Sequence, residues 1–177
     1  KDDGMAGELG WDHRIEDIPE KGLTVVREAD AEERQRIAAT LDLVACPSLK
    51  ASYTVTPMSL GRYRLAGELH AEIEQTCVVT LDPMPGTVDE TFEAVFWPED
   101  AMPEPQAGQV DLDGDPDPEP IAGGRIDAGR VIFESLAAAI DPFPRRPGAV
   151  FEGPLSSPEG GKPESPFAVL ANLKGKG

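Results

Sequence analysis

The sequence predicts an α+β fold: an antiparallel β meander with two packed helices, a long acidic loop and an extended C-terminal tail. Apolar and polar residues alternate over residues 63–81, which is typical of a half-buried strand. Residues 30–44 and 127–140 carry apolar positions at helical spacing. Proline and glycine gather between and after these segments, which indicates irregular chain there.

Three strands are expected to form the meander, over residues 48–56, 63–81 and 88–98. Eight apolar residues of the middle strand fall at odd-numbered positions: Tyr63, Leu65, Leu69, Ala71, Ile73, Cys77, Val79 and Leu81. Five polar residues fall at even-numbered positions: Arg64, Glu68, His70, Glu72 and Glu74. We expect a kink or bulge at Gly67 and a turn over residues 82–86, "DPMPG".

Both helices have a start signal. Asp30 followed by Glu33 is a capping-box pattern, and Asp127 is placed to cap the second helix. The apolar stripe of the first helix is Ile37, Leu41 and Val44, and Pro47 is expected to end the pattern. The apolar side of the second helix is Val131, Ile132, Ser135, Leu136 and Ile140.

The predicted organisation is a single α+β domain over residues 11–150, which includes an acidic loop at 98–120. Residues 1–10 are expected to be a flexible N-terminus, of which 1–4 are set aside as a candidate expression remnant. Residues 151–177 are expected to be a Pro/Gly linker that leads into an amphipathic C-terminal tail.

Charge restricts the classes of partner. The formal net charge is −17, and a field of that sign opposes the phosphate contacts on which nonspecific nucleic-acid binding depends. We therefore expect a basic protein partner and no DNA, although acidity could also serve only solubility. No apolar run reaches membrane-spanning length, and two cysteines without a signal peptide favour a cytoplasmic protein with reduced thiols.

No motif predicts catalysis, a cofactor or a metal. Read as a calcium loop from Asp111, the segment "DLDGDPDPE" places Pro116 where glycine is needed and Ala122 where the bidentate glutamate is needed. His70 is expected to be an exposed cross-strand residue, and Cys77 a buried structural thiol. A third hypothesis is an enzyme with an acidic metal site, but no spacing of acidic residues in the sequence supports it.

Four stretches resemble, in their order and spacing, the YceD family, also known as the DUF177 domain. They are "EQTCVVTLDPM", "VDETFEAVF", "DPEPIAGGRIDAGRVIFESLAAAIDPFPRRPG" and "SPFAVLANLK", and the resemblance covers most of the chain from about residue 16. Cys77 matches the first cysteine of the family's Cys-x-x-Cys, and Thr80 replaces the second. Leu81, Asp82 and Pro83 keep the rest of the motif. A single cysteine cannot supply a two-thiolate zinc half-site or a vicinal redox pair.

The resemblance implies a cytoplasmic, non-catalytic role in accumulation of the large-subunit (23S) ribosomal RNA, through its synthesis, processing or stability during ribosome assembly. The expected partner is a basic ribosomal protein or a large-subunit precursor particle, and RNA contact is expected to be indirect or local. The alternative is direct RNA binding by a local patch of arginines: Arg62, Arg64, Arg125, Arg130, Arg145 and Arg146.

The C-terminal tail is expected to bind a partner. Its candidate partner-binding residues are Phe167, Leu170, Leu173 and Lys174. An amphipathic segment of this kind commonly docks in an apolar groove. The sequence leaves open whether the groove belongs to a partner or to the same domain.

Overall fold

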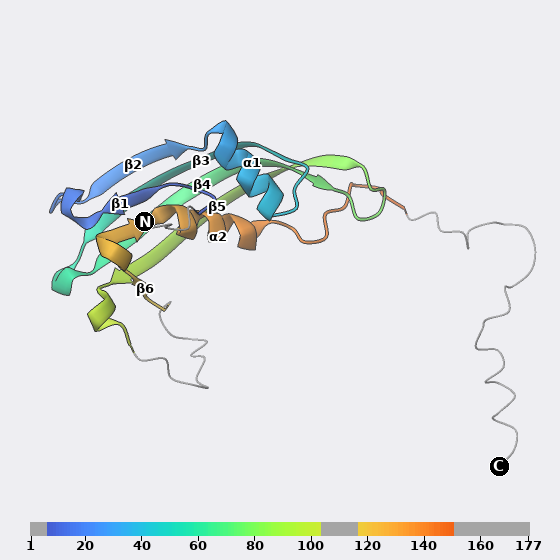
Figure 1. The fold of residues 1–177 in the computed structure, drawn as a ribbon. Helices are drawn as coiled ribbons and strands as arrows, with labels where there is room; N and C mark the ends of the chain where they lie inside the picture. The colour runs from blue at the N-terminus through green and yellow to red at the C-terminus, as the bar shows by residue number, and fades with distance from the viewer. Residues whose placement is uncertain (1–6, 104–116, 151–177) are drawn as a thin grey trace, which may run out of the picture.

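The computed structural model describes residues 7–103 and 117–150 of the 177-residue chain. Its main sheet has five strands in the order β2-β3-β4-β5-β6. The three long strands β3 (Ala45–Pro57), β4 (Tyr63–Thr76) and β5 (Pro83–Trp97) form an antiparallel meander. Figure 1 shows them running together as a long curved layer. The predicted α+β fold with a β meander is confirmed.

Shorter elements complete the fold. The helices are α1 (Ala31–Thr40) and α2 (Ala128–Ala139), and the short strands are β1 (Asp12–Arg14), β2 (Leu23–Glu28), β6 (Glu119–Pro120) and β7 (Arg125–Asp127). β2 pairs antiparallel with β3, β6 pairs parallel with the end of β5, and β1 pairs with β7 in a separate two-stranded sheet. Single 3-10 turns lie at Ile15–Asp17, Ser59–Gly61, Glu99–Ala101 and Ala122–Gly124.

The predicted capping box starts α1. Asp30 Oδ1 accepts a hydrogen bond from the Glu33 N–H at 2.8 Å, and Glu33 Oε2 accepts one from the Asp30 N–H at 3.0 Å. Glu33 Oε1 also accepts from the Gly10 N–H at 3.1 Å, so this nearly buried carboxylate ties the N-terminal segment to the helix. The inclusion of Val44 in the apolar stripe was wrong, because α1 ends at Thr40 and Val44 is exposed.

α2 also begins as predicted, since Asp127 Oδ1 accepts a hydrogen bond from the Arg130 N–H at 2.9 Å. Its buried side chains include Val131, Ile132 and Leu136. Leu9 packs tightly against the first turn of this helix and is itself buried, although it falls within the segment 1–10 that was expected to be flexible. The packed part of the chain therefore reaches at least to Leu9.

One face of the sheet carries the core. Apolar side chains from β3, β4 and β5 meet residues of both helices in a single buried cluster, whose largest fully buried members are Tyr53, Phe96, Ile37, Leu49, Leu65, Ile126, Ile132 and Leu136. Because α1 and α2 both contribute to this cluster, they cover the same face of the sheet. The opposite face is covered by none of the elements that the structure describes.

The bulge expected at Gly67 is absent. The register between β4 and its neighbours is regular there, with Gly67 opposite Tyr53 on one side and Phe92 on the other. A Cβ at position 67 would lie 2.5 Å from Tyr53 Cβ and 2.3 Å from the Ser52 carbonyl oxygen. The glycine is there because the backbone of β3 approaches β4 closely.

The turn between β4 and β5 lies earlier than predicted. β4 ends at Thr76, so Cys77, Val79 and Leu81 are not strand residues, and the "DPMPG" segment opens β5 instead of turning the chain. Pro83 pairs with Thr76, and Pro85 pairs with Glu74. Proline fits here because, among the described residues, this half of β5 is paired with β4 only, so no second ladder needs its missing N–H.

The acidic loop expected at 98–120 is partly tested. Residues 104–116 lie outside the described residues. At its two ends the segment contains the 3-10 turn Glu99–Ala101 and the short strand β6. None of the described helices combines the length and the apolar character needed to cross a membrane.

Candidate protein-interaction site

The family-motif residues form the turn between β4 and β5. The Cys77 N–H donates to the Asp82 carbonyl oxygen, and the Leu81 N–H donates to the Cys77 carbonyl oxygen, both at 2.9 Å. Leu81 adopts a left-handed conformation with φ 60° and is 75% exposed. The two bonds close the loop, and Leu81 is left projecting from its tip into solvent.

The chain that follows α2 docks on this turn. The Val78 N–H donates to the Pro144 carbonyl oxygen at 2.9 Å, and the Arg146 N–H donates to Cys77 Sγ at 3.4 Å. The Arg146 guanidinium reaches the Pro83 carbonyl oxygen at 2.8 Å and Asp82 Oδ2 at 3.4 Å. These hydrogen bonds could not be predicted from the sequence, because they join residues that lie more than 60 positions apart along the chain.

Cys77 is buried as predicted, but within the turn and not on a strand. Its pKa is lowered to about 6 because the Arg146 N–H, the Thr80 hydroxyl and the N–H groups of Thr80 and Val79 stabilise the thiolate. Thr80, which stands where the family motif has a second cysteine, therefore contributes to lowering the pKa of the first. Burial raises the pKa of the other free thiol, Cys46.

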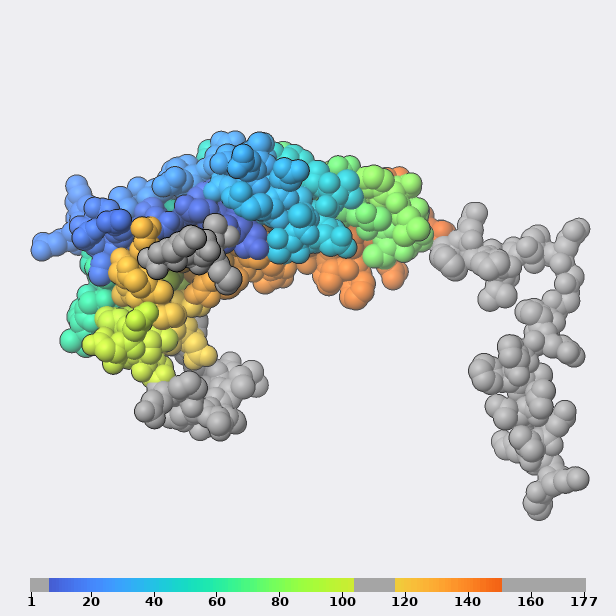
Figure 2. Space-filling view, in the orientation of Figure 1, coloured from blue at the N-terminus to red at the C-terminus, as the bar shows by residue number. Residues whose placement is uncertain are grey.

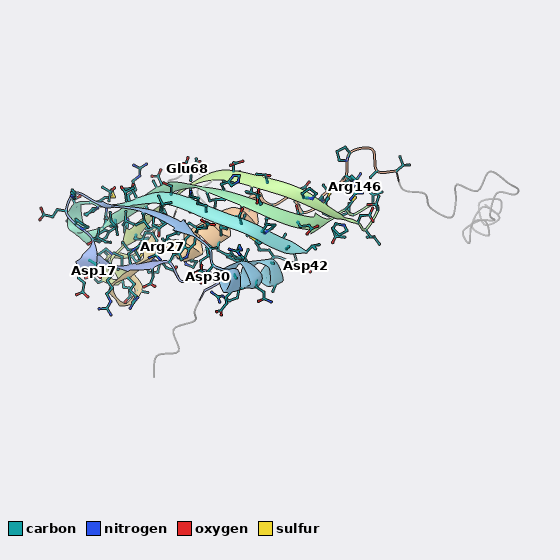
Figure 3. All side chains as sticks on the ribbon, turned by 90° about the horizontal axis from the view of Figure 1, so that it is seen from above. Asp17, Arg27, Asp30, Asp42, Glu68 and Arg146 are labelled. Atoms are coloured by element: carbon teal, nitrogen blue, oxygen red, sulfur yellow. The ribbon has the colours of Figure 1, made fainter. Side chains whose placement is uncertain are left out.

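The uncovered side of the five-stranded sheet, called here the open face, carries cross-strand rows of polar side chains. The register places Glu28, Lys50, His70 and Asp89 in one row across four strands. The next row is Val26, Ser52, Glu68 and Thr91, and Glu72 lies in the row on the other side. Figure 3, in which Glu68 marks this face, shows side chains projecting from it along the length of the sheet.

Acidic side chains outnumber basic ones on the open face. The acids are Glu28, Glu68, Glu72, Glu74, Asp89 and Glu93, against Lys50 and Arg64, and His70 lies among them. His70 is exposed, as predicted, and its Nδ1 lies 2.7 Å from Asp89 Oδ1. A shallow hollow of about 460 Å³ lies at this row, lined by Lys50, Ser52, Glu68, Leu69, His70, Asp89, Glu90 and Thr91.

The candidate arginines do not gather into one patch. Arg64, on β4, forms a two-bond ion pair with Glu93 at 2.6 and 2.7 Å. Arg125 pairs with Asp12, and Arg130 pairs with Glu119 and Glu134. Arg146 lies at the β4–β5 turn, at the opposite end of β4 from Arg62.

Arg62 takes part in a contact that the sequence did not reveal. Its guanidinium carbon lies 3.6 Å from the centroid of the Trp97 ring, a cation–π geometry. Its Nε is buried without a hydrogen-bond partner among the described residues. Arg145 is exposed next to Arg146. Most of these cations are therefore already engaged with carboxylates or an aromatic ring.

The remaining sequence predictions concern residues that the structure does not describe. Phe167, Leu170, Leu173 and Lys174 lie outside the described residues. Over residues 7–103 and 117–150, no three metal-ligating side chains come together in a group that could hold an ion.

The fold and these surfaces define an α+β protein built on a long antiparallel meander, with one packed face and one open acidic face. Residues 65–174 match the sequence model of the family described as "Large ribosomal RNA subunit accumulation protein YceD". The match covers more than half of the chain, so the chain belongs to this family and has a role in large ribosomal RNA subunit accumulation. Neither the curated proteins nor the solved structures contain a match to it.

Proposed function

We propose that this protein is a cytoplasmic, non-enzymatic factor that supports synthesis, processing or stability of the large-subunit (23S) ribosomal RNA through protein contacts during ribosome assembly. The proposed partner is a basic ribosomal protein or a large-subunit precursor particle. Contact with RNA is indirect or local in this proposal.

The open face is the observation that carries the proposal. It is a continuous surface over four strands, with six carboxylates and a hollow at the row of Lys50, His70 and Asp89. Complementary potentials speed encounter and suppress wrong partners. A basic segment of a ribosomal protein is complementary to this face, whereas the phosphates of bare RNA are repelled by it.

Affinity purification of the full-length tagged protein from growing cells tests the proposal, with protein and RNA both identified. The variant Glu68→Lys/Glu72→Lys reverses two charges on the open face. The matched control Glu20→Lys/Glu32→Lys makes the same change in net charge at exposed positions away from this face. We expect the wild type and the control to recover large-subunit proteins or precursor particles, and the open-face variant to lose most of them.

Retention of the same partners by the open-face variant would count against the proposal. The direct RNA-binding alternative makes a different prediction, which filter binding to large-subunit ribosomal RNA over a salt series can detect. A steep fall of affinity with salt, abolished by Arg145→Ala/Arg146→Ala, would support it.

A further inference from the structure

A groove of about 500 Å³ lies at the end of the molecule that carries the β4–β5 turn. Its walls come from the loop after α1, the end of β4 and the chain after α2: Leu41, Asp42, Leu43, Val44, Gln75, Thr76, Val78, Ile140, Asp141, Pro142 and Pro144. We call it the end groove. Its volume lies in the range of small-molecule and cofactor binding pockets.

Hydrogen bonds between the three segments hold the walls in place. The Val44 N–H donates to the Glu74 carbonyl oxygen at 2.8 Å, Gln75 Nε2 donates to the Asp141 carbonyl oxygen at 2.9 Å, and Val78 is bonded to Pro144. The segments are blue, green and orange in Figure 2, which shows them adjoining at one end of the molecule. The groove is therefore part of the packed fold.

Exposed apolar side chains concentrate at this end. Of the eight large hydrophobic residues that are exposed in the described chain, five lie in or beside the segments that form the end groove and its neighbouring turn: Val44, Val78, Leu81, Phe143 and Val150. Phe143 and Val150 are 70% and 76% exposed. Of these five residues, Val44 and Val78 line the end groove itself.

The apolar C-terminal segment, residues 166–174, has matching chemistry. It carries Phe167, Val169, Leu170 and Leu173 as apolar side chains. Residues 165–177 contain Lys174 and Lys176 and no acidic residue, whereas the charged side chains that line the end groove are Asp42 and Asp141. Val44 and Val78 offer apolar contacts within a lining whose exposed surface is mostly polar, and the charges at the rim are opposite in sign to Lys174 and Lys176.

Chain length permits this contact. Val150, the last described residue, belongs to the same end as the end groove, and Figure 3 shows Asp42 and Arg146 at that end, away from Asp17. Sixteen residues, 151–166, separate Val150 from Phe167. This stretch contains four prolines and three glycines, and a chain of that length reaches from roughly 20 Å when flexible to about 50 Å when its prolines extend it.

We propose that the apolar C-terminal segment docks in the end groove of its own chain, with Phe167 and Leu170 against Val44 and Val78, and Lys174 near Asp42 and Asp141. The short tether supplies an effective concentration in the millimolar range, so an intrinsic Kd below about 1 mM suffices for most molecules to be docked. The contact needs no second molecule, and it is therefore independent of the partner proposed for the open face.

Amide NMR spectra of the isolated full-length protein test this inference. The variant Phe167→Ser/Leu170→Ser removes the proposed anchors, and Leu155→Ser is the control because it removes one apolar side chain from the linker. We expect the double variant to shift amide signals of residues 41–44, 75–78 and 140–144, and the control to leave them unchanged. The shifts should not depend on protein concentration.

A reciprocal change in the end groove completes the test. Val44→Asp replaces an exposed apolar side chain of the groove lining with a charge and should shift the signals of residues 166–174, whereas Leu60→Asp, at an exposed apolar position elsewhere, should not. Unchanged groove signals in the tail variant would overturn the proposal. Groove shifts that vanish on dilution, with a dimeric mass in light scattering, would also overturn it and assign the groove to a second copy. Because no partner is present, neither result bears on the open-face proposal.

Discussion

The backbone N–H of Arg146 donates a hydrogen bond to Cys77 Sγ across 3.4 Å, between residues 69 positions apart in the chain. This bond joins the β4–β5 turn to the segment that follows α2. The Arg146 side chain reinforces the link through the Pro83 carbonyl oxygen and Asp82. The last described segment is thus attached to the meander by the family-motif residues themselves.

Cys77 should titrate near neutrality. Hydrogen bonds from the Arg146 N–H, Thr80 and the Val79 N–H lower the pKa of its thiol from 9.0 to about 6. In a Cys46→Ala background, the ultraviolet absorbance of the thiolate should rise with a midpoint near pH 6. Cys77→Ser should remove the transition, and a midpoint at or above 9 would refute the prediction.

The same pKa shift makes folding stability depend on pH. Because the folded-state pKa lies below the unfolded value of 9.0, the thiolate contributes stability that is fully present above pH 9 and is lost as the pH falls through about 6. The stability difference between wild type and Cys77→Ser should therefore grow in favour of the wild type from pH 6 to pH 9. Urea unfolding at several pH values measures it, and a flat difference would contradict the prediction.

Gly67→Ala should destabilise the fold by about 1–3 kcal/mol, because the added methyl group would overlap the Ser52 carbonyl oxygen and Tyr53 Cβ. Chemical denaturation provides the measurement. Gly10→Ala is a suitable control, since its Cβ would meet nothing closer than Glu33 Oε1 at 3.9 Å. Equal stability of the two variants would show that β3 and β4 can separate at this point without loss.

Asp30→Ala should reduce stability by about 1 kcal/mol, because it removes the acceptor for the Glu33 N–H at the start of α1. Asp30→Ser should restore most of the loss, since a serine hydroxyl can accept the same bond. Thermal unfolding followed by circular dichroism compares the three proteins. Should serine be as destabilising as alanine, the capping bond would not be the source of the effect.

Tyr53→Phe should lower stability by about 1 kcal/mol, because the buried Tyr53 hydroxyl lies 2.9 Å from His13 Nε2 and makes a hydrogen bond with it. Burial raises the pKa of Tyr53 to about 12, so the phenol remains neutral over the ordinary pH range. Tyr63→Phe, at a half-buried position on β4, serves as the control. Equal unfolding midpoints for wild type and Tyr53→Phe would exclude a net contribution from the bond.

Features that depend on neighbouring residues could be predicted from the sequence. The Asp30–Glu33 capping box, the Asp127 cap and the alternation along β4 each involve positions a few residues apart, and each is confirmed. The end of β4 could not be predicted, because alternation continues through Leu81 although the turn is closed by backbone bonds. The role of Gly67 also depends on the distant Tyr53, which sequence spacing cannot reveal.

The candidate surfaces, too, could be predicted only as far as they depend on residues of a single strand. Alternation along one strand predicted the exposed positions of Glu68, His70 and Glu72. Their combination with Glu28 and Asp89 into rows needed the register of four strands. The end groove needed more, because its walls come from three segments that are separated along the chain by many residues.

The length of β4 sets a fixed distance between the two ends of the molecule. Its 14 residues separate the Arg62–Trp97 stack at one end from the Cys77 turn at the other, a span of roughly 45 Å. A 100-residue domain has a radius of gyration of about 13 Å, so one small protein cannot touch both ends. An assembly that contacts both ends of β4 must therefore be larger than a single compact domain. If such an assembly binds along the open face, the sheet would fix the relative positions of its components.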